Sequence, residues 1–385
     1  MKKQVLVVSP GFPYPPVDGH KLKLYNLISQ LSLHFDVDLL VISNENVSKE
    51  ASSFLNKTCR TVTVFPRSRF LSFLNVFLAF FQGSMPLQVA YYSSEKVNKY
   101  IKSGESHYDS IILNLIRTAG YARPVFEHKI ILDLVDSIAI NYMRSRKRTS
   151  SIFFKYIYTI EAKRLLKYEK KMVQHAKCTL FVNKDEALYY SKFGNVEWLP
   201  NGVNSALLKK ASIGRKKHFC FFGAMFYQPN IDAVKWFVAN VLPLVNPEIT
   251  FYIVGVNPSR SIRSLENERI KVTGFLDDPY ELIQTGLCTV APMQTGGGIQ
   301  NKILESMALG QLTITNNLGA RPIVGSVPMN HFLIANTPIE FASLINAIYE
   351  NPTDFDHIKT NARDFILQQF SWKSYGDSLK AIIEA

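Results

Sequence analysis

The chain has 385 residues, a net charge of +13, 47% hydrophobic residues and 19% charged residues. Its length favours two domains, and its composition excludes a disordered polypeptide. The positive charge indicates an anionic partner, which a nucleic acid, a phosphate-bearing ligand or a membrane surface would supply.

The N-terminal half opens with a strand at Gln4–Ser9, a loop at Pro10–His20, a helix at Lys21–Phe35 and a strand at Val37–Ser43. This alternation predicts a parallel sheet. Because the first apolar run is too short for the core of a signal peptide, we interpret it as a strand. Further buried strands are predicted at Ser110–Ile116, Lys129–Val135 and Cys178–Asn183.

The segment Val196–Asn204 ("VEWLPNGVN") predicts a strand and a turn, and we place the domain boundary there. Strands and helices then alternate again, which predicts a second α/β domain. The expected domains are residues 1–200, completed by a C-terminal helix at 370–385, and residues 203–369. Strands are expected within 218–225, 249–256, 270–278, 287–293 and 311–316, and helices at 230–245, 279–286 and 299–310.

The stretch "TGGGIQNKILE" (295–305) places a glycine-rich turn between a strand and a helix. Backbone N–H groups at the start of such a helix bind anions, diphosphates among them. Gly296, Gly297 and Gly298 would allow the ligand to approach the backbone closely. The other reading, a tight turn followed by an ordinary Lys–Glu surface pair, stays open.

The helix after this turn has two faces. Ile299, Ile303 and Met307 recur at four-residue spacing and predict the buried stripe, and Gly310 closes the helix. Lys302 falls in the first turn, beside the expected phosphate position. Glu305 follows one turn later, where its carboxylate could accept two sugar hydroxyls, and Asn301 shares its face.

The positive charge is concentrated in one stretch. Between Asn141 and Lys177 there are eleven basic residues and two acidic ones, Glu161 and Glu169. Together with the apolar, aromatic run Phe70–Phe81, which is shorter than the roughly 20 residues that span a bilayer, this stretch predicts a peripheral contact with an anionic membrane surface. The alternative is a solvated helix face that covers the domain.

Several classes of site are excluded. The sequence has no Walker motif, no GxGxxG after the first strand, no HExxH, no His/Cys cluster and no GxSxG, which disfavours an NAD, metal or serine hydrolase site. No RNA- or DNA-reading motif accompanies the basic stretch, so we expect no nucleic-acid partner. The four cysteines are far apart, which indicates free thiols in a reducing compartment and a cytoplasmic protein.

Several segments together resemble the family 4 glycosyltransferases, retaining nucleotide-sugar enzymes. These are "LVVSPGFPYPPVDGHKLKLYNLISQLS", "LPNGVN", "FFGAMFYQPNIDAVKWF", "FYIVGVNP", "IKVTGFLDDPYEL", "VAPMQTGGGIQNKILESMALGQLTITNNLGA" and "FSWKSY". The resemblance covers nearly the whole chain. It implies an α/β protein of GT-B architecture, with two Rossmann-like domains facing across a cleft and the donor bound mainly to the second.

The donor site departs from the usual family pattern. The family has a glutamate eight residues before Glu305, where this chain has Gly297. The chain resembles a subgroup in which a GGGxxNK turn replaces that glutamate, leaving Glu305 to contact the nucleotide ribose. The family's diphosphate-neutralising Arg and Lys are missing from "GAMFYQPN", and Lys302 is the candidate replacement. The resemblance implies further donor contacts at Gly19, His20, Gly223, Met225, Asn230, Gly274 and Phe275.

Alternatives stay open at three of these positions. The family's acceptor-side histidine is missing, and the equivalent "ILDLVDS" offers Asp133 and Asp136. Asp136 ends a strand, where its carboxylate could orient or deprotonate the acceptor hydroxyl, or it caps a helix that starts at Ser137. His20 contacts the donor phosphate or is a solvated residue at a helix start. Phe275 marks a loop that holds the base through its backbone, or its ring is part of the core.

The resemblance implies sugar transfer from a nucleotide-diphosphate sugar to a glycan or polyprenyl-linked acceptor, with retention and without metal or cofactor. Asp136, Lys302 and Glu305 are the candidate catalytic residues. We expect a role in bacterial surface polysaccharide or exopolysaccharide synthesis, in the cytoplasm or on the inner face of the cell membrane. Two other functions stay open: a nucleotide-sugar 2-epimerase of similar architecture, and a non-catalytic nucleotide-sugar-binding partner of another transferase.

Overall fold

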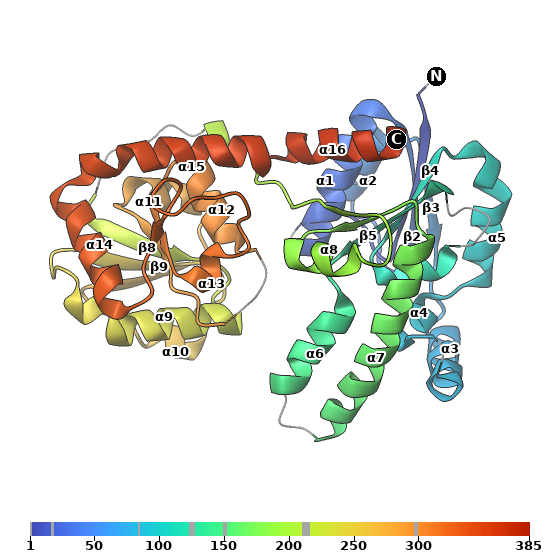
Figure 1. Cartoon of the computed structure of the whole chain (residues 1–385), viewed down its shortest axis with the longest axis horizontal. Coiled ribbons are helices and arrows are strands. Elements are labelled where there is room, and N and C mark those ends of the chain that lie inside the picture. Colours follow the sequence, from blue (N-terminus) through green and yellow to red (C-terminus); the bar gives the residue numbers. More distant parts are fainter. Residues whose placement is uncertain are drawn as a thin grey trace. The chain divides into compact units, whose positions relative to one another are not determined.

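The computed structural model describes residues 2–16, 19–83, 85–122, 128–148, 152–209, 216–295 and 299–385. They form two compact units (Figure 1). The first contains the chain up to Asn201 together with Tyr375–Ala385, and the second contains Gly202–Ser374. The last helix, α16 (Trp372–Glu384), therefore begins in the second unit and ends in the first.

The first unit is built on a seven-stranded parallel sheet in the order β3-β2-β1-β4-β5-β6-β7. The strand order reverses between β1 and β4, which are neighbours, and ligands of such sheets bind at the carboxyl ends beside that reversal. The predicted strands are confirmed, and the structure adds β3, which was not predicted. The bounds of the strands are β1 Gln4–Ser9, β2 Asp36–Ile42, β3 Thr61–Phe65, β4 Ser110–Asn114, β5 Ile130–Val135, β6 Cys178–Phe181 and β7 Val196–Trp198.

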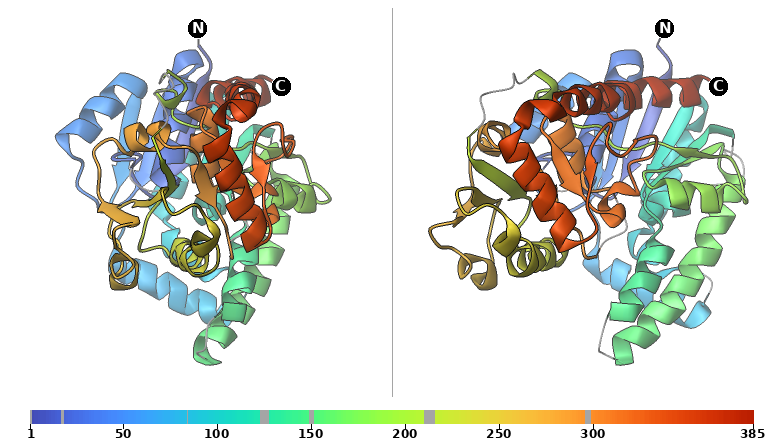
Figure 2. Two further views of the ribbon diagram at one scale, coloured as in Figure 1. Left: turned by 90° about the vertical axis from the view of Figure 1, so that its left-hand side faces the viewer. Right: turned by 60° about the vertical axis from the view of Figure 1, so that its left-hand side comes forward.

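In the described part of the first unit, eight α-helices connect these strands. The first begins at Gly19, two residues before the predicted start. The run Phe70–Phe81 lies within α3, and the basic stretch forms most of α6 and α7, which lie side by side (Figures 1 and 2). The bounds are α1 Gly19–His34, α2 Lys49–Thr58, α3 Arg69–Gln82, α4 Leu87–Tyr92, α5 Glu95–Gly104, α6 Ile138–Arg148, α7 Ile152–His175 and α8 Lys184–Tyr190.

The second unit repeats the plan with a six-stranded parallel sheet in the order β10-β9-β8-β11-β12-β13. The order reverses between the neighbouring strands β8 and β11. The strands are β8 His218–Phe222, β9 Thr250–Val254, β10 Ile270–Gly274, β11 Thr289–Ala291, β12 Thr313–Thr315 and β13 Leu333–Ile334. The helices are α9 Gln228–Asn240, α10 Arg260–Arg263, α11 Pro279–Thr285, α12 Asn301–Ala308, α13 Asn317–Ala320, α14 Pro338–Glu350 and α15 Asp356–Gln369.

Two predicted helices of this unit are shorter than expected. The helix predicted at 230–245 ends at Asn240, and a 3₁₀ turn that contains Pro243 follows; proline cannot donate the next backbone hydrogen bond of an α-helix. The helix predicted at 299–310 begins at Asn301, so Ile299 lies outside it and is only half-buried, whereas Ile303 and Met307 are fully buried. Gly310 has φ +67°, as a residue that closes a helix requires.

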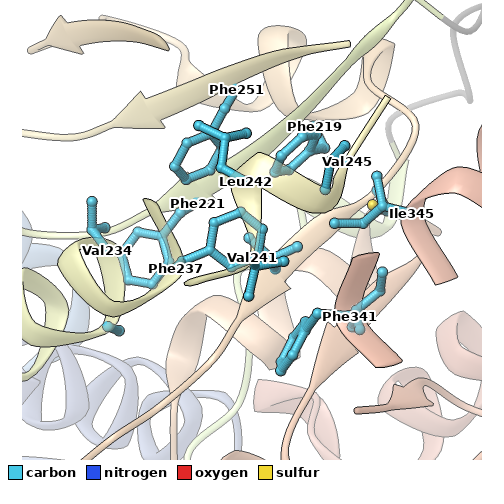
Figure 3. Close-up of a cluster of buried hydrophobic side chains, with 14 of the residues drawn as sticks. Phe219, Phe221, Val234, Phe237, Val241, Leu242, Val245, Phe251, Phe341 and Ile345 are labelled. Atoms are coloured by element: carbon cyan, nitrogen blue, oxygen red, sulfur yellow. The ribbon is translucent and has the colours of Figure 1, made fainter. Parts of the chain in front are cut away.

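Aromatic packing holds the second unit together (Figure 3). Phe219 of β8 stacks on Phe251 of β9 with ring centroids 4.9 Å apart, Phe237 of α9 packs against Phe251, and Phe341 of α14 packs against Phe237. Burying each such ring stabilises the fold by roughly 1.5–3 kcal/mol. This core fixes the carboxyl ends of β8 and β9, which carry the candidate site.

Candidate functional site

The loops that follow β8 and β9 approach each other closely at two glycines, beside the switch point of the second sheet. Gly223 follows β8 with φ +147°, and Gly255 follows β9 with φ +152°. A Cβ atom on Gly255 would lie 1.7 Å from the carbonyl oxygen of Gly223, so no other residue fits there without moving the backbone. The Cβ position of Gly223 lies 3.4 Å from Cε of Lys302, in the first turn of α12.

Lys302, the second residue of α12, is buried behind Gly223. Its Nζ atom donates a hydrogen bond to Asn230 Oδ1 and lies 4.4 Å from the centroid of the Phe221 ring. Asn230 is held in turn by the bond from its Nδ2 to the carbonyl oxygen of Ala224, at 2.9 Å. Burial lowers the pKa of Lys302 to about 7, while Glu305 favours its charged form.

Glu305 lies one turn along the same helix. The hydroxyl of Tyr280, on α11, donates a hydrogen bond to Glu305 Oε2 at 3.2 Å. Burial raises the pKa of Glu305 to about 7, and the bond from Tyr280 and the charge of Lys302 oppose that rise. Since Lys302 is only 9% exposed, the alternative of an ordinary Lys–Glu surface pair is wrong.

The remaining predicted donor-binding residues differ in how accessible they are to a ligand. Asn301 is exposed, and Gly274 ends β10 at φ +69°. Phe275 is 70% exposed, so the alternative that its ring belongs to the core is wrong. Met225 is fully buried in the core, so a donor contact at this position would involve its backbone. Gly296, Gly297 and Gly298 lie outside the described residues.

The first unit has a polar network at the carboxyl ends of β4 and β5. His20 Nε2 lies 2.7 Å from Asn114 Oδ1, and Asn114 Nδ2 donates to Asp133 Oδ2 at 3.0 Å. Lys23 Nζ lies 2.5 Å from the other carboxylate oxygen, Oδ1. Because the amide group of Asn114 points its nitrogen at Asp133, its oxygen must accept from His20, and the ring proton of His20 is on Nε2. His20, half-buried at the start of α1, is therefore held in place by Asn114.

Sequence reasoning missed Lys23 and Asn114, although both gave a signal. Lys23 lies four residues before Leu27 on the buried face of α1, and Asn114 ends the apolar run of β4. A lysine on an apolar stripe must find an anionic partner or lose its charge. Here the partner is Asp133, and all three side chains are fully buried.

Asp136 lies beyond β5, and its side chain is exposed. Ser137 Oγ accepts the N–H of Ile140 at 3.2 Å, the cap position that the alternative reading gave to Asp136. Two buried carboxylates hold this turn, because Ser137 donates its N–H to Glu186 and its hydroxyl to Glu169, at 2.6 and 2.7 Å. Burial raises the pKa of Glu169. The turn that carries Asp136 is thus fixed from α7 and α8.

Within the ranges described above, no group of three or more His, Cys, Asp or Glu side chains could hold a metal ion. All four cysteines are free, and Cys178, Cys220 and Cys288 are buried. Burial raises the pKa of the Cys178 thiol to about 12, which makes it unreactive.

Comparison with known proteins supports a glycosyltransferase. Residues 216–351 match the family model described as Glycosyl transferases group 1. An uncharacterized 44.6 kDa protein in the cps region of Klebsiella pneumoniae is 26% identical over 404 residues, covering 98% of each chain.

Solved structures support the fold. Sucrose-phosphate synthase from Thermosynechococcus elongatus superposes with a TM-score of 0.65 at 15% identity, covering 100% of this chain and 98% of that one. The Anabaena protein HepE in complex with UDP gives 0.66 at 14% identity, covering 99% of each. These likenesses confirm the predicted fold class: an α/β chain with two Rossmann-like domains, as in GT-B glycosyltransferases.

Proposed function

We propose that this chain is a retaining glycosyltransferase that binds the diphosphate of a nucleotide sugar at Lys302. The observation that carries the proposal is the burial of this lysine at the switch point of the second sheet, against the neutral amide of Asn230. Among the described residues the structure records no ion pair for Lys302. A buried cation is costly unless an anion accompanies it, and a bound diphosphate would be that anion.

The other proposed donor contacts lie at the same edge of the second sheet. Glu305, held by Tyr280, would accept hydrogen bonds from the ribose hydroxyls. The loop at Gly274 and Phe275 follows β10 on the far side of β9 and would hold the base. Gly223 and Asn230 would shape the phosphate site around Lys302, whose Cε lies 3.4 Å from the Cβ position of Gly223.

Catalysis by this chain would depend on electrostatic stabilisation of the leaving diphosphate. As the bond between the sugar and the diphosphate breaks, negative charge grows on the leaving phosphate oxygen. Lys302 and the N-terminus of α12 would stabilise that charge in place of a metal ion. The acceptor oxygen would bond to the anomeric carbon from the same face, its proton passing to the leaving phosphate, so that no nucleophilic carboxylate is needed.

The acceptor would bind to the first unit. Asp136, exposed at the end of β5, would orient its hydroxyl group, and His20, fixed through Asn114, would contact the donor phosphate. The UDP complex of HepE supports a uridine nucleotide sugar, and the cps-region relative supports a role in surface polysaccharide synthesis. The acceptor would then be a glycan or a polyprenyl-linked sugar. We place this reaction on the cytoplasmic side of the cell membrane.

A second function is favoured by one residue. Gly297 stands where the usual family has a glutamate that contacts the transferred sugar. A chain without that contact could bind the nucleotide sugar and assist another transferase. The two functions differ in turnover, since only an enzyme would hydrolyse the donor slowly in the absence of acceptor.

The test is a panel of nucleotide sugars with purified protein. We first expect thermal stabilisation by at least one donor, and then slow release of its nucleoside diphosphate, accelerated by an acceptor glycan. Lys302→Met should abolish release, and Lys235→Met, at an exposed lysine of α9, should leave it unchanged. Donor binding without turnover over a broad acceptor panel would favour the binding partner, and absence of binding to every donor would contradict both functions.

A further inference from the structure

Helix α3 exposes an unusual amount of apolar surface. Five phenylalanines of this 14-residue helix, Phe70, Phe73, Phe77, Phe80 and Phe81, are 48–76% exposed, and three leucines between them are exposed as well. Single exposed apolar side chains are normal on a soluble protein, but a contiguous patch marks an interaction surface.

The helix is attached to the first unit by its small and polar residues. Ser72 and Ala79 are buried, and Asn75 donates to the carbonyl oxygen of Ser93 at 3.2 Å. At 100° per residue, the exposed side chains cover roughly half of the helix circumference. An amphipathic helix that served only the protein core would turn this apolar half inward.

The basic helix α7 adjoins α3. Arg164 donates to the carbonyl oxygen of Phe80 at 2.9 Å, and its guanidinium lies 5.9 Å from the Phe80 ring centroid. Figure 1 shows the two helices on the same side of the first unit. The apolar patch and the basic stretch are therefore joined by a direct contact.

Within the described part of the chain, the structure records no ion pair for the exposed lysines of α7. Lys155, Lys163, Lys167 and Lys171 are exposed and separated by multiples of four residues, which puts them on one face of α7. Sequence reasoning counted Glu161 and Glu169 as charges that oppose them. Both are buried: Glu161 accepts the N–H of Leu87 and pairs with Arg164 at 3.2 Å, and Glu169 accepts from Ser137, so neither pairs with these four lysines. Helix α3 has no acidic residue at all.

We infer that α3 lies in the interface of an anionic phospholipid bilayer, with its phenylalanines among the acyl chains and the lysines of α7 at the lipid phosphates. An amphipathic helix of this length lies in the membrane plane. No helix in the part of the chain that the structure describes is long and apolar enough to cross a membrane. A two-fold dimer through α3 would instead bring like-charged lysines of two copies together, which opposes it.

This inference stands on the surface of the first unit alone. Only its consequence, that a lipid-linked acceptor would reach the first unit at the membrane, rests on the proposed function. Nucleotide binding to the second unit should therefore be the same in all of the variants below.

The test is flotation of the purified chain with phosphatidylcholine vesicles, with and without phosphatidylglycerol, at low and high salt. We expect binding to phosphatidylglycerol vesicles that weakens at high salt. Phe73→Ser/Phe77→Ser should weaken it at least about tenfold, since two rings leave the acyl region. The matched control, Leu188→Ser/Ile339→Ser, changes two exposed apolar residues elsewhere, at 67% and 70%, and should bind as the parent does.

A pair of charge-reversing substitutions separates the contribution of the α7 lysines to vesicle binding from that of the α3 phenylalanines. Lys163→Glu/Lys167→Glu should remove the preference for phosphatidylglycerol, whereas Lys235→Glu should not. Failure of the parent to float with either vesicle at low salt would overturn the inference. So would an oligomer that Phe73→Ser/Phe77→Ser converts to a monomer without any vesicle binding, because a second copy would then cover α3. Calorimetry with a nucleoside diphosphate on the same samples tests the proposed function separately.

Discussion

Lys302 donates a hydrogen bond to the side-chain oxygen of Asn230 inside the second unit, and Glu305 lies one turn further along the same helix. Burial brings the pKa of Lys302 down to about 7 and that of Glu305 up to about 7. The site therefore holds a cation and a carboxylate that both titrate close to neutral pH, at the place where a diphosphate and a ribose would bind.

Nucleotide affinity should depend on pH through both groups. Lys302 carries its charge below about pH 7, so affinity should fall as the pH rises above this value. Glu305 carries its charge above about pH 7, so affinity should also fall as the pH drops below it. Titration calorimetry from pH 6 to 9 should give a maximum near pH 7. Lys302→Met should flatten the alkaline side and Glu305→Gln the acidic side, and an identical profile in all three proteins would contradict the assignment.

Tyr280 should set the acidic side of this profile. Its hydrogen bond stabilises the ionised form of Glu305, so Tyr280→Phe should raise the pKa of Glu305 further. The acidic limb of nucleotide affinity should then move to higher pH, while affinity at pH 9 stays close to that of the parent. A uniform loss at every pH would show that Tyr280 contacts the ligand itself.

Breaking the buried ion pair Lys23–Asp133 should cost the first unit more stability than breaking an exposed ion pair costs. Lys23→Met or Asp133→Asn leaves one buried group without its partner, and each should cost about 3–5 kcal/mol of local stability. Lys23→Met/Asp133→Leu should recover much of that loss. Hydrogen exchange of peptides from α1 and β5 measures it. The exposed pair Lys217–Glu248 is the control, and Glu248→Gln should change exchange little.

These two networks show what the sequence could and could not predict. The strands were predicted because a parallel strand covered on both faces is a continuous apolar run, as "HFCFF" and "IILDLV" are. Lys302 and Glu305 were found because the glycine-rich turn places them on a helix start. The partner of Lys23, Asp133, lies on β5, 110 residues away, and nothing in the local pattern of α1 indicates it.

The sequence also did not predict which charged side chains are buried. Glu161 and Glu169 look like members of a solvated basic helix, since they sit among lysines at helical spacing. Their inward direction follows from α7 packing against the turn at Ser137 and the start of α4, which are tertiary contacts. In the same way, the end of α9 at Asn240 was missed because apolar periodicity continues through Pro243.

Two glycines should respond unequally to alanine. Gly255→Ala places a Cβ atom 1.7 Å from the oxygen of Gly223, and should unfold the second unit or make it insoluble. Gly274→Ala has the same positive sign of φ but no atom within 4 Å of its Cβ position, so it should cost only about 1–2 kcal/mol. Expression and thermal denaturation measure both, and equal tolerance would contradict the close approach of the two loops.

Lys302 would bind the diphosphate of the donor, and Glu305 would bind its ribose. Titration calorimetry at pH 7 with a nucleoside diphosphate and the corresponding nucleoside, UDP and uridine first, separates these contacts. Lys302→Met should remove the preference for the diphosphate and leave nucleoside affinity unchanged. Glu305→Ala should weaken both ligands alike, by tenfold to over a hundredfold for a charged hydrogen bond of roughly 1.5–3 kcal/mol. If the parent and both folded variants bind the two ligands equally, the site lies elsewhere.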